Sequence, residues 1–241
     1  MPRLSDFSAA FRGSSAITKA YFNGSSNDIG AVHRYFTRID TGSKGFELGA
    51  VIPIPSGPMA YRVRMAFIGN VSLRISPVLG DSRIELDSVS GSLEFYYRFG
   101  GVEYPLATLE GDYSDGSIVE YVLAYDGANV EGFINGASVG VTARTVGGFN
   151  VNDVFPDGAG NSVYYPQSVE IWFDTNDTST DPDWACQFDS DGTGSTETDT
   201  VGGNNLTRIG LTPADTELFT FDSASNSWKN SDESVVLPVT Y

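Results

Sequence analysis

Hydrophobic and polar residues alternate over most of this 241-residue chain, as they do in β-strands that have one buried face. In residues 119–125, for example, Val119, Tyr121, Leu123 and Tyr125 share one face of the predicted strand. No helical periodicity extends beyond about two turns. The pattern predicts strands at 17–23, 33–39, 46–54, 61–68, 71–75, 82–86, 91–99, 102–109, 119–125, 130–134, 137–141, 168–173, 206–211, 218–221 and 235–241.

Turn residues separate the predicted strands. Asn135-Gly136 is typical of a type I′ hairpin, because both central residues of that turn need a positive φ. Asp126 and Gly127 favour a turn shortly before it. Residues 119–141 are therefore predicted to form an antiparallel meander of three strands.

Three segments have a weaker strand pattern. Pro53, Pro55 and Pro58 predict an edge strand or a loop around 46–58, because proline cannot donate a ladder hydrogen bond. Residues 150–166 are rich in Gly, Pro and Asn and predict a long loop. After the predicted strand 168–173, a long acidic loop is expected from residue 174 to about residue 205, because turn residues are frequent there.

Cysteine content and charge exclude several classes of protein. A single cysteine, Cys186, excludes an internal disulfide framework. We expect neither a signal peptide nor membrane insertion, because no apolar run is long enough for either. Of the net charge of −17, residues 1–100 contribute +3 and residues 101–241 contribute −20. The negative charge of residues 101–241 disfavours nucleic acid and anionic lipid as partners. The near-neutral residues 1–100 are therefore the better candidate for docking onto a partner.

Four short motifs carry a resemblance to a known family. Tyr-Asp-Gly (125–127) and Phe-Ile-Asn-Gly (133–136) resemble the central hairpin of laminin-G-like and concanavalin-A-like jelly rolls. Ala-Tyr-Phe-Asn-Gly-Ser (20–25) resembles the first strand of such domains, and Arg-Ile-Gly (208–210) a segment near the end of the sheet. The resemblance implies an all-β fold, an antiparallel two-sheet jelly-roll sandwich, over residues 17–241.

Residues 1–16 are predicted to form a short N-terminal arm. A frayed terminus and a segment that attaches the protein to a partner are both compatible with this composition. The attachment hypothesis uses three apolar residues at helical spacing and two arginines, namely Leu4, Phe7, Phe11, Arg3 and Arg12.

The acidic loop is a candidate calcium site, because carboxylates are preferred Ca²⁺ ligands and domains of the resembled family often hold one Ca²⁺ at the sheet rim. The predicted ligands are Asp174, Asp177, Asp189 and Asp191. The twelve-residue spacing of an EF-hand is absent, and a solvated acidic loop is the alternative.

A glycan site is a second hypothesis, since sugar sites combine an aromatic platform with Asp or Asn side chains. Trp184, which lies within a polar stretch, is expected to be exposed and to provide this platform. The predicted glycan-binding residues are Trp184, Tyr164, Tyr165, Asn161 and Asp183.

Catalysis has weaker support. Glu170 and Asp174 would lie about 13 Å apart along one strand, whereas a retaining glycosidase needs about 5 Å. His33 has no nucleophile near it in sequence, and Cys186 is expected to pack as a small hydrophobic residue.

The resemblance extends to laminin-G-like domains of phage proteins and, with the absence of disulfides and of a signal peptide, implies a non-enzymatic virion protein of a bacteriophage or phage-like particle. Such a protein would be made in the host cytoplasm and used as a head spike, decoration protein or tail fibre. Its expected partners are other virion proteins, through the N-terminal part, and host cell-surface polysaccharide. A homo-oligomer is also expected. The alternatives are a glycan-active hydrolase of the same fold, a secreted carbohydrate-binding module and a purely structural protein that binds no sugar.

Overall fold

We describe the protein from a computed structural model. The described residues are 32–40, 44–54, 56–68, 73–77, 83–89, 92–99, 102–109, 115–143, 149–154 and 163–241. The chain divides into two units, Met1–Val32 and His33–Tyr241, and almost all described residues belong to the second. The predicted arm (1–16), its attachment residues (Leu4, Phe7, Phe11, Arg3 and Arg12) and the predicted strand 17–23 lie outside the described residues.

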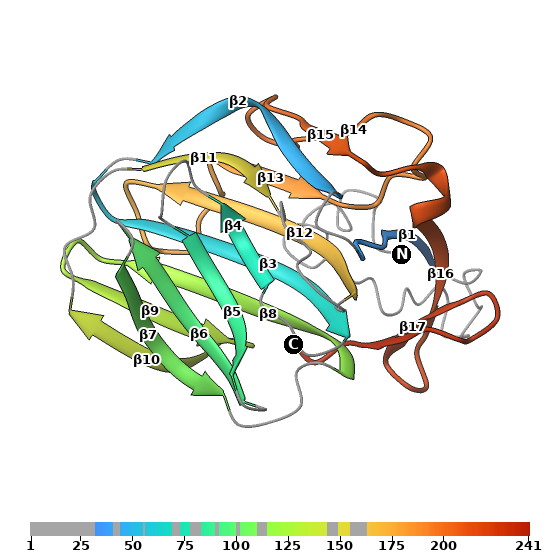
Figure 1. Cartoon of the computed structure of the whole chain (residues 1–241), viewed down its shortest axis with the longest axis horizontal. Helices are drawn as coiled ribbons and strands as arrows, with labels where there is room; N and C mark the ends of the chain where they lie inside the picture. Colours follow the sequence, from blue (N-terminus) through green and yellow to red (C-terminus); the bar gives the residue numbers. More distant parts are fainter. Residues whose placement is uncertain are drawn as a thin grey trace, which may run out of the picture. The chain divides into compact units, whose positions relative to one another are not determined.

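A six-stranded antiparallel sheet, in the order β10-β9-β8-β3-β12-β13, forms one layer of the second unit (Figure 1). Its strands are β3 (Met59–Ile68), β8 (Asp115–Tyr125), β9 (Asn129–Ile134), β10 (Ala137–Ala143), β12 (Val163–Phe173) and β13 (Trp184–Gln187). The predicted meander is confirmed as β8, β9 and β10. Asn135 and Gly136 have φ values of 49° and 77°, as the type I′ turn requires.

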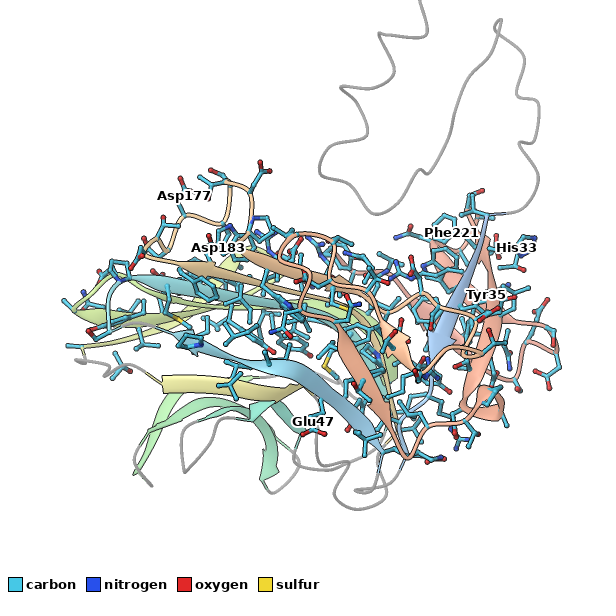
Figure 2. The ribbon with its side chains drawn as sticks, turned by 90° about the horizontal axis from the view of Figure 1, so that it is seen from above. His33, Tyr35, Glu47, Asp177, Asp183 and Phe221 are labelled. Carbon is cyan, nitrogen blue, oxygen red and sulfur yellow. The ribbon has the colours of Figure 1, made fainter. Side chains whose placement is uncertain are left out.

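Two four-stranded sheets lie on one side of the six-stranded sheet (Figure 2). The first, β11-β2-β15-β14, consists of β11 (Phe149–Val154), β2 (Gly45–Ile54), β15 (Leu206–Ile209) and β14 (Thr196–Glu197). The second consists of β4 (Leu73–Pro77), β5 (Arg83–Val89), β6 (Ser92–Phe99) and β7 (Val102–Leu109) in chain order. Since β4 lies against β11, the two sheets together form the second layer. The predicted antiparallel jelly-roll sandwich is confirmed.

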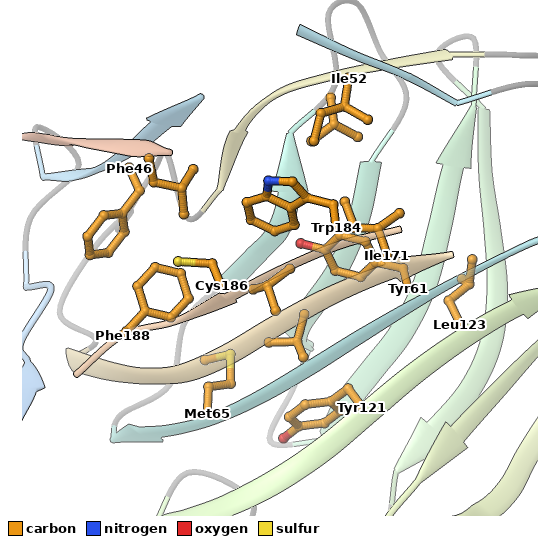
Figure 3. Close-up of a cluster of buried hydrophobic side chains, with 14 of the residues drawn as sticks. Phe46, Ile52, Tyr61, Met65, Tyr121, Leu123, Ile171, Trp184, Cys186 and Phe188 are labelled. Carbon is orange, nitrogen blue, oxygen red and sulfur yellow. The ribbon is translucent and has the colours of Figure 1, made fainter. Parts of the chain in front are cut away.

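The main core fills the space between these layers. Tyr61, Val63 and Met65 point into it from β3 because alternate residues of a strand face the same side. Trp184 and Cys186 project into the same cluster from β13 (Figure 3). Burial raises the pKa of the Cys186 thiol, and the nearby Glu197 carboxylate adds to this effect. Cys186 therefore packs as a small apolar side chain, as predicted.

A further four-stranded sheet packs against the opposite face of the six-stranded sheet, which we call the outer face. It is ordered β1-β16-β17-β18 and comprises β1 (His33–Thr37), β16 (Thr216–Asp222), β17 (Ser227–Asn230) and β18 (Val236–Pro238). Phe36 and Trp228 from this sheet form a second core with Ala66, Ile118 and Tyr165 of the outer face. One part of the outer face is thereby buried.

The structure corrects three predictions about strands. The predicted acidic loop from residue 174 to about residue 205 contains β13 and β14. β2 lies between β11 and β15 and is not an edge strand. It tolerates Pro53 because β15 pairs only with Gly45–Leu48, so Pro53 has a strand partner on one side alone. The predicted loop at 150–166 instead contains most of β11 and the start of β12.

Helical structure is scarce in the described part of the chain, where the 3₁₀ turn η2 (Pro213–Asp215) is the one helical element. No helix there is long and apolar enough to cross a membrane.

Candidate functional site

Four charged side chains form a ladder across three neighbouring strands of the outer face. Arg62 and Arg64 project from β3 on the side opposite to Tyr61, Val63 and Met65, because side chains alternate along a strand. The strand register places Glu170 of β12 opposite Arg62 and Glu120 of β8 opposite Arg64. We call Arg62, Arg64, Glu120 and Glu170 the charged ladder.

Close ion pairs hold the charged ladder together. Nη1 of Arg62 donates to Oε2 of Glu170 at 3.0 Å, and Nε of Arg64 donates to Oε2 of Glu120 at 2.8 Å. Arg62 Nε lies 3.6 Å from the same Glu120 oxygen, which links the two pairs. Each of the four side chains keeps 14–16% of its surface exposed. The ladder is thus a fixed but accessible set of donors and acceptors.

Aromatic rings flank the ladder. The Arg62 guanidinium carbon lies 4.9 Å from the centre of the Trp172 ring, and that of Arg64 lies 5.1 Å from the centre of the Tyr241 ring. Trp172 is buried and donates through Nε1 to the carbonyl oxygen of Thr180 at 3.0 Å. Tyr241, in contrast, is 41% exposed. It provides an aromatic surface beside the ladder.

The loop after β12 covers one end of this arrangement. Nη2 of Arg62 donates to the carbonyl oxygen of Thr178 at 3.0 Å, which anchors the loop to the outer face. Figure 2 shows the loop, marked by Asp177, and the sheet that carries His33 and Tyr35 at opposite ends of the same face. The ladder residues lie on β8, β3 and β12, three neighbouring strands of this sheet.

Arg34 extends from β1 toward the same face. Its Nη2 donates to the carbonyl oxygen of Gln167 at 2.7 Å and to Oε1 of Gln187 at 3.3 Å. The hydroxyl of Tyr241 also donates to a Gln167 oxygen, in this case Oε1 of the side chain. Burial lowers the pKa of the Arg34 guanidinium, whereas the carboxylate of Asp189 opposes this effect. Gln167 thus connects Arg34 with Tyr241.

The predicted aromatic platform is wrong. Trp184 is only 2% exposed, because β13 directs its ring into the main core, where Nε1 donates to the carbonyl oxygen of Asn204 at 3.0 Å (Figure 3). Tyr164 and Tyr165 are also buried, in the main core and the second core respectively. Asp183 is exposed, and its Oδ2 accepts the backbone N–H of Phe173. Asn161 lies outside the described residues.

The structure does not gather the four predicted calcium ligands, Asp174, Asp177, Asp189 and Asp191. Within the described ranges, no group of three or more His, Cys, Asp or Glu residues is arranged to hold a metal ion. Asp177 and Asp191 instead accept hydrogen bonds from the residues two positions later, Ser179 and Thr193, and these bonds lower the pKa of both carboxyl groups. Calcium binding therefore stays a prediction, without a site in the described structure.

The candidate catalytic residues do not form a pair. Glu170 belongs to the charged ladder, whereas Asp174 lies at the start of the exposed loop with a φ of 60°. Within the ladder, Glu170 and Glu120 both bind Arg62. His33 is exposed, and its Nδ1 lies 3.0 Å from the Thr220 hydroxyl.

The prediction from sequence missed the ladder because its members are far apart in the chain. A signal was present: Arg62 and Arg64 occupy the polar face of their strand, and Glu120 interrupts an otherwise apolar face of another. Their meeting depends on the order and register of β8, β3 and β12, which the sequence pattern does not specify. Arg34 and Tyr241 had no comparable signal.

Comparisons with known proteins identify the fold. No family model and no curated protein sequence matches this chain. A candidate carbohydrate-binding protein from Bacteroides ovatus has a similar structure, with a TM-score of 0.50 and 14% sequence identity over 76% of this chain. The chain spans 61% of the length of that protein. At this identity the likeness shows a shared β-sandwich fold.

Two other similar structures have lower scores. A heptameric SAP-like pentraxin from Limulus polyphemus has a TM-score of 0.47 and 10% identity, with 61% of this chain and 77% of that chain covered. A carbohydrate binding module from Bacillus subtilis has a TM-score of 0.36 and 13% identity, with 59% and 94% covered.

Proposed function

We propose that this protein is a non-enzymatic carbohydrate-binding domain that contacts glycan through the outer face of its six-stranded sheet. The observation that carries the proposal is the charged ladder beside the exposed Tyr241 ring. The fold shared with a candidate carbohydrate-binding protein supports the same class. Fold alone does not define a ligand, so the proposal depends on the side chains of this face.

The chemistry of the ladder suits sugar hydroxyl groups. A hydroxyl group both donates and accepts hydrogen bonds, so it can bind a guanidinium N–H and a carboxylate oxygen together. Arg62 and Glu120 offer these two kinds of group side by side. Tyr241 adds an apolar ring surface on which a sugar ring can pack. Because ion pairs hold the ladder in place, little side-chain entropy is lost on binding.

The same contacts favour binding over hydrolysis. A jelly-roll glycosidase needs two carboxyl groups that are free to act on the scissile bond. Here Glu120 and Glu170 are both bound by guanidinium groups, and Glu170 has no partner in Asp174.

A glycan array followed by calorimetry tests the proposal. The wild-type protein should bind at least one glycan saturably, and Tyr241→Ala should weaken this binding at least about fivefold, as expected for loss of a contact worth more than 1 kcal/mol. Leu218→Ala is the matched control, because Leu218 is similarly exposed at 43% but lies on β16. A wild-type protein that binds no glycan, or an unaffected Tyr241→Ala variant, would contradict the assignment.

For the biological setting, we propose that the domain belongs to a phage or phage-like virion and binds host polysaccharide. Two features support this proposal: the sequence resemblance to jelly-roll domains, and the contrast in charge between residues 1–100, which are near neutral, and residues 101–241, which are strongly acidic. Deletion of residues 2–16 should prevent incorporation into particles, measured by mass spectrometry of purified virions. Normal incorporation of the deletion variant would refute attachment through this segment.

A further inference from the structure

The outer face continues beyond the charged ladder onto β9 and β10, the last two strands of the six-stranded sheet. On β9, Val130 and Ile134 point into the main core and are buried. Because side chains alternate along a strand, Glu131 and Phe133 point to the outer face, where both are half-buried. The outer face of β9 therefore presents an aromatic ring and a carboxylate.

Strand pairing joins these two residues to the ladder on one side and to β10 on the other. Phe133 lies opposite Val122 of β8, and Val122 in turn lies opposite the ladder strand β3. On its other side, Phe133 pairs with Ser138 of β10, and Glu131 pairs with Val141. We call Glu131, Phe133, Ser138 and Val141 the β9–β10 patch.

The β9–β10 patch is open to solvent. Val141 is 58% exposed, and Ser138 is exposed beside it. The Ser138 hydroxyl donates a hydrogen bond to Oε1 of Glu131, which fixes the carboxylate on the surface. An aromatic ring next to a held carboxylate and a hydroxyl is a combination that suits a sugar, since the ring can pack on its apolar side and the oxygens can bind its hydroxyl groups.

The spacing between this patch and the ladder indicates the size of the ligand. Tyr241 lies beside Arg64 of β3, and Phe133 lies on β9, two strands away. Since neighbouring strands are about 5 Å apart, the two aromatic residues are associated with strands about 10 Å apart. This separation exceeds the width of one sugar ring, so a ligand that contacts both residues must contain several linked sugars.

The charge of the patch indicates that this ligand is uncharged. Glu131 is the one charged residue of β9 and β10, so these strands provide no cation for an acidic sugar. A carboxylate or sulfate group on a sugar would be repelled by Glu131. A second copy of this chain is also disfavoured on this surface, because each copy has a net charge of −17.

We infer that the β9–β10 patch is a second sugar subsite, and that the outer face binds a linear, uncharged oligosaccharide or polysaccharide that crosses the strands from Tyr241 to Val141. The ladder lies between the two aromatic residues and binds the hydroxyl groups of the sugars that connect them. This inference rests on the proposed function and specifies its class of ligand.

Oligosaccharides of increasing length provide the test. The probes are three neutral linear series, β-1,4-glucan, β-1,4-mannan and α-1,4-glucan, each from disaccharide to hexasaccharide, and oligogalacturonate as the acidic comparison. In at least one neutral series, calorimetry should show the hexasaccharide binding at least about tenfold more tightly than the disaccharide, because only the longer chain reaches both subsites. Oligogalacturonate of the same length should bind more weakly than that neutral hexasaccharide.

Phe133→Leu separates the second subsite from a structural role. It keeps an apolar side chain over Val122 but removes the ring. The affinity for the hexasaccharide should fall about fivefold, whereas the affinity for the disaccharide, which retains the subsite at Tyr241, should change little. A purely structural effect would change both affinities alike. Phe221→Leu is the matched control, because Phe221 is also half-buried but lies on β16 in a different sheet.

The outcomes distinguish this inference from the proposed function. Affinity that does not increase beyond the disaccharide, a length dependence that survives in Phe133→Leu, or tighter binding of oligogalacturonate overturns the inference and leaves the proposed function standing. Self-association in analytical ultracentrifugation that Val141→Ser abolishes also overturns it, because a second copy then covers the patch. If neither these probes nor the glycans of the array bind, both proposals are wrong.

Discussion

Replacing Arg208 by methionine removes the cation from a buried ion pair that joins three parts of the fold. Nη1 of Arg208 in β15 donates to Oε1 of Glu197 in β14 at 2.6 Å, and the two side chains are only 2% and 1% exposed. Arg208 also donates to the Thr216 hydroxyl of β16 at 2.7 Å and to the Ser190 hydroxyl at 3.2 Å. The substitution leaves the Glu197 carboxylate buried without its counter-ion.

The expected loss is large compared with the stability of an ordinary domain. Removing one partner of a buried ion pair costs about 3–5 kcal/mol, against a total stability of about 5–15 kcal/mol. Urea denaturation should therefore show a clearly lower midpoint for Arg208→Met with an unchanged slope. Arg208→Met combined with Glu197→Leu should recover most of the loss, because no buried charge then remains.

The pH dependence gives an independent check. Burial raises the pKa of Glu197 above its ordinary value of 4.5, and loss of Arg208 would raise it further. A raised pKa in the folded state means that this group favours folding at low pH and loses that contribution as pH rises through the folded pKa. The stability difference between wild type and Arg208→Met should thus be widest at neutral pH and narrow toward pH 4.5. A loss below about 1 kcal/mol, or a difference that widens on acidification, would refute the reasoning.

Three further predictions concern core, turn and metal. Trp184→Ala should destabilise the protein by about 3–5 kcal/mol in urea denaturation, because it opens a cavity in the main core; a neutral effect would contradict the burial of this side chain. Gly136→Val should cost about 1–3 kcal/mol in the same assay, since a β-branched residue is strained at positive φ, whereas Val141→Ala on the exposed side of β10 serves as the control. If the acidic loops bind Ca²⁺, a hundredfold excess over Kd should stabilise the protein by about 2.7 kcal/mol and EDTA should reverse the rise in melting temperature; an unchanged melting temperature would contradict calcium binding.

Much of the all-β fold followed from local patterns. The alternation in residues 119–125 and the Asn135-Gly136 turn predicted β8, β9 and β10 correctly, because a strand with one buried face and a two-residue hairpin both depend on neighbouring residues. The prediction of 150–166 as a loop failed because turn residues there were given more weight than pairing with β2, a strand about a hundred positions earlier.

The sequence by itself determined which residues form strands and which faces of those strands are polar, because both depend on spacing within a few residues. Only the tertiary structure decided that Trp184 is buried and that Arg34, Arg62, Glu120 and Glu170 share one face. Those relations depend on the order and register of strands that are separated by tens to more than a hundred residues. A polar residue on a strand is compatible with many partners, and pairing across the sheet selects one of them.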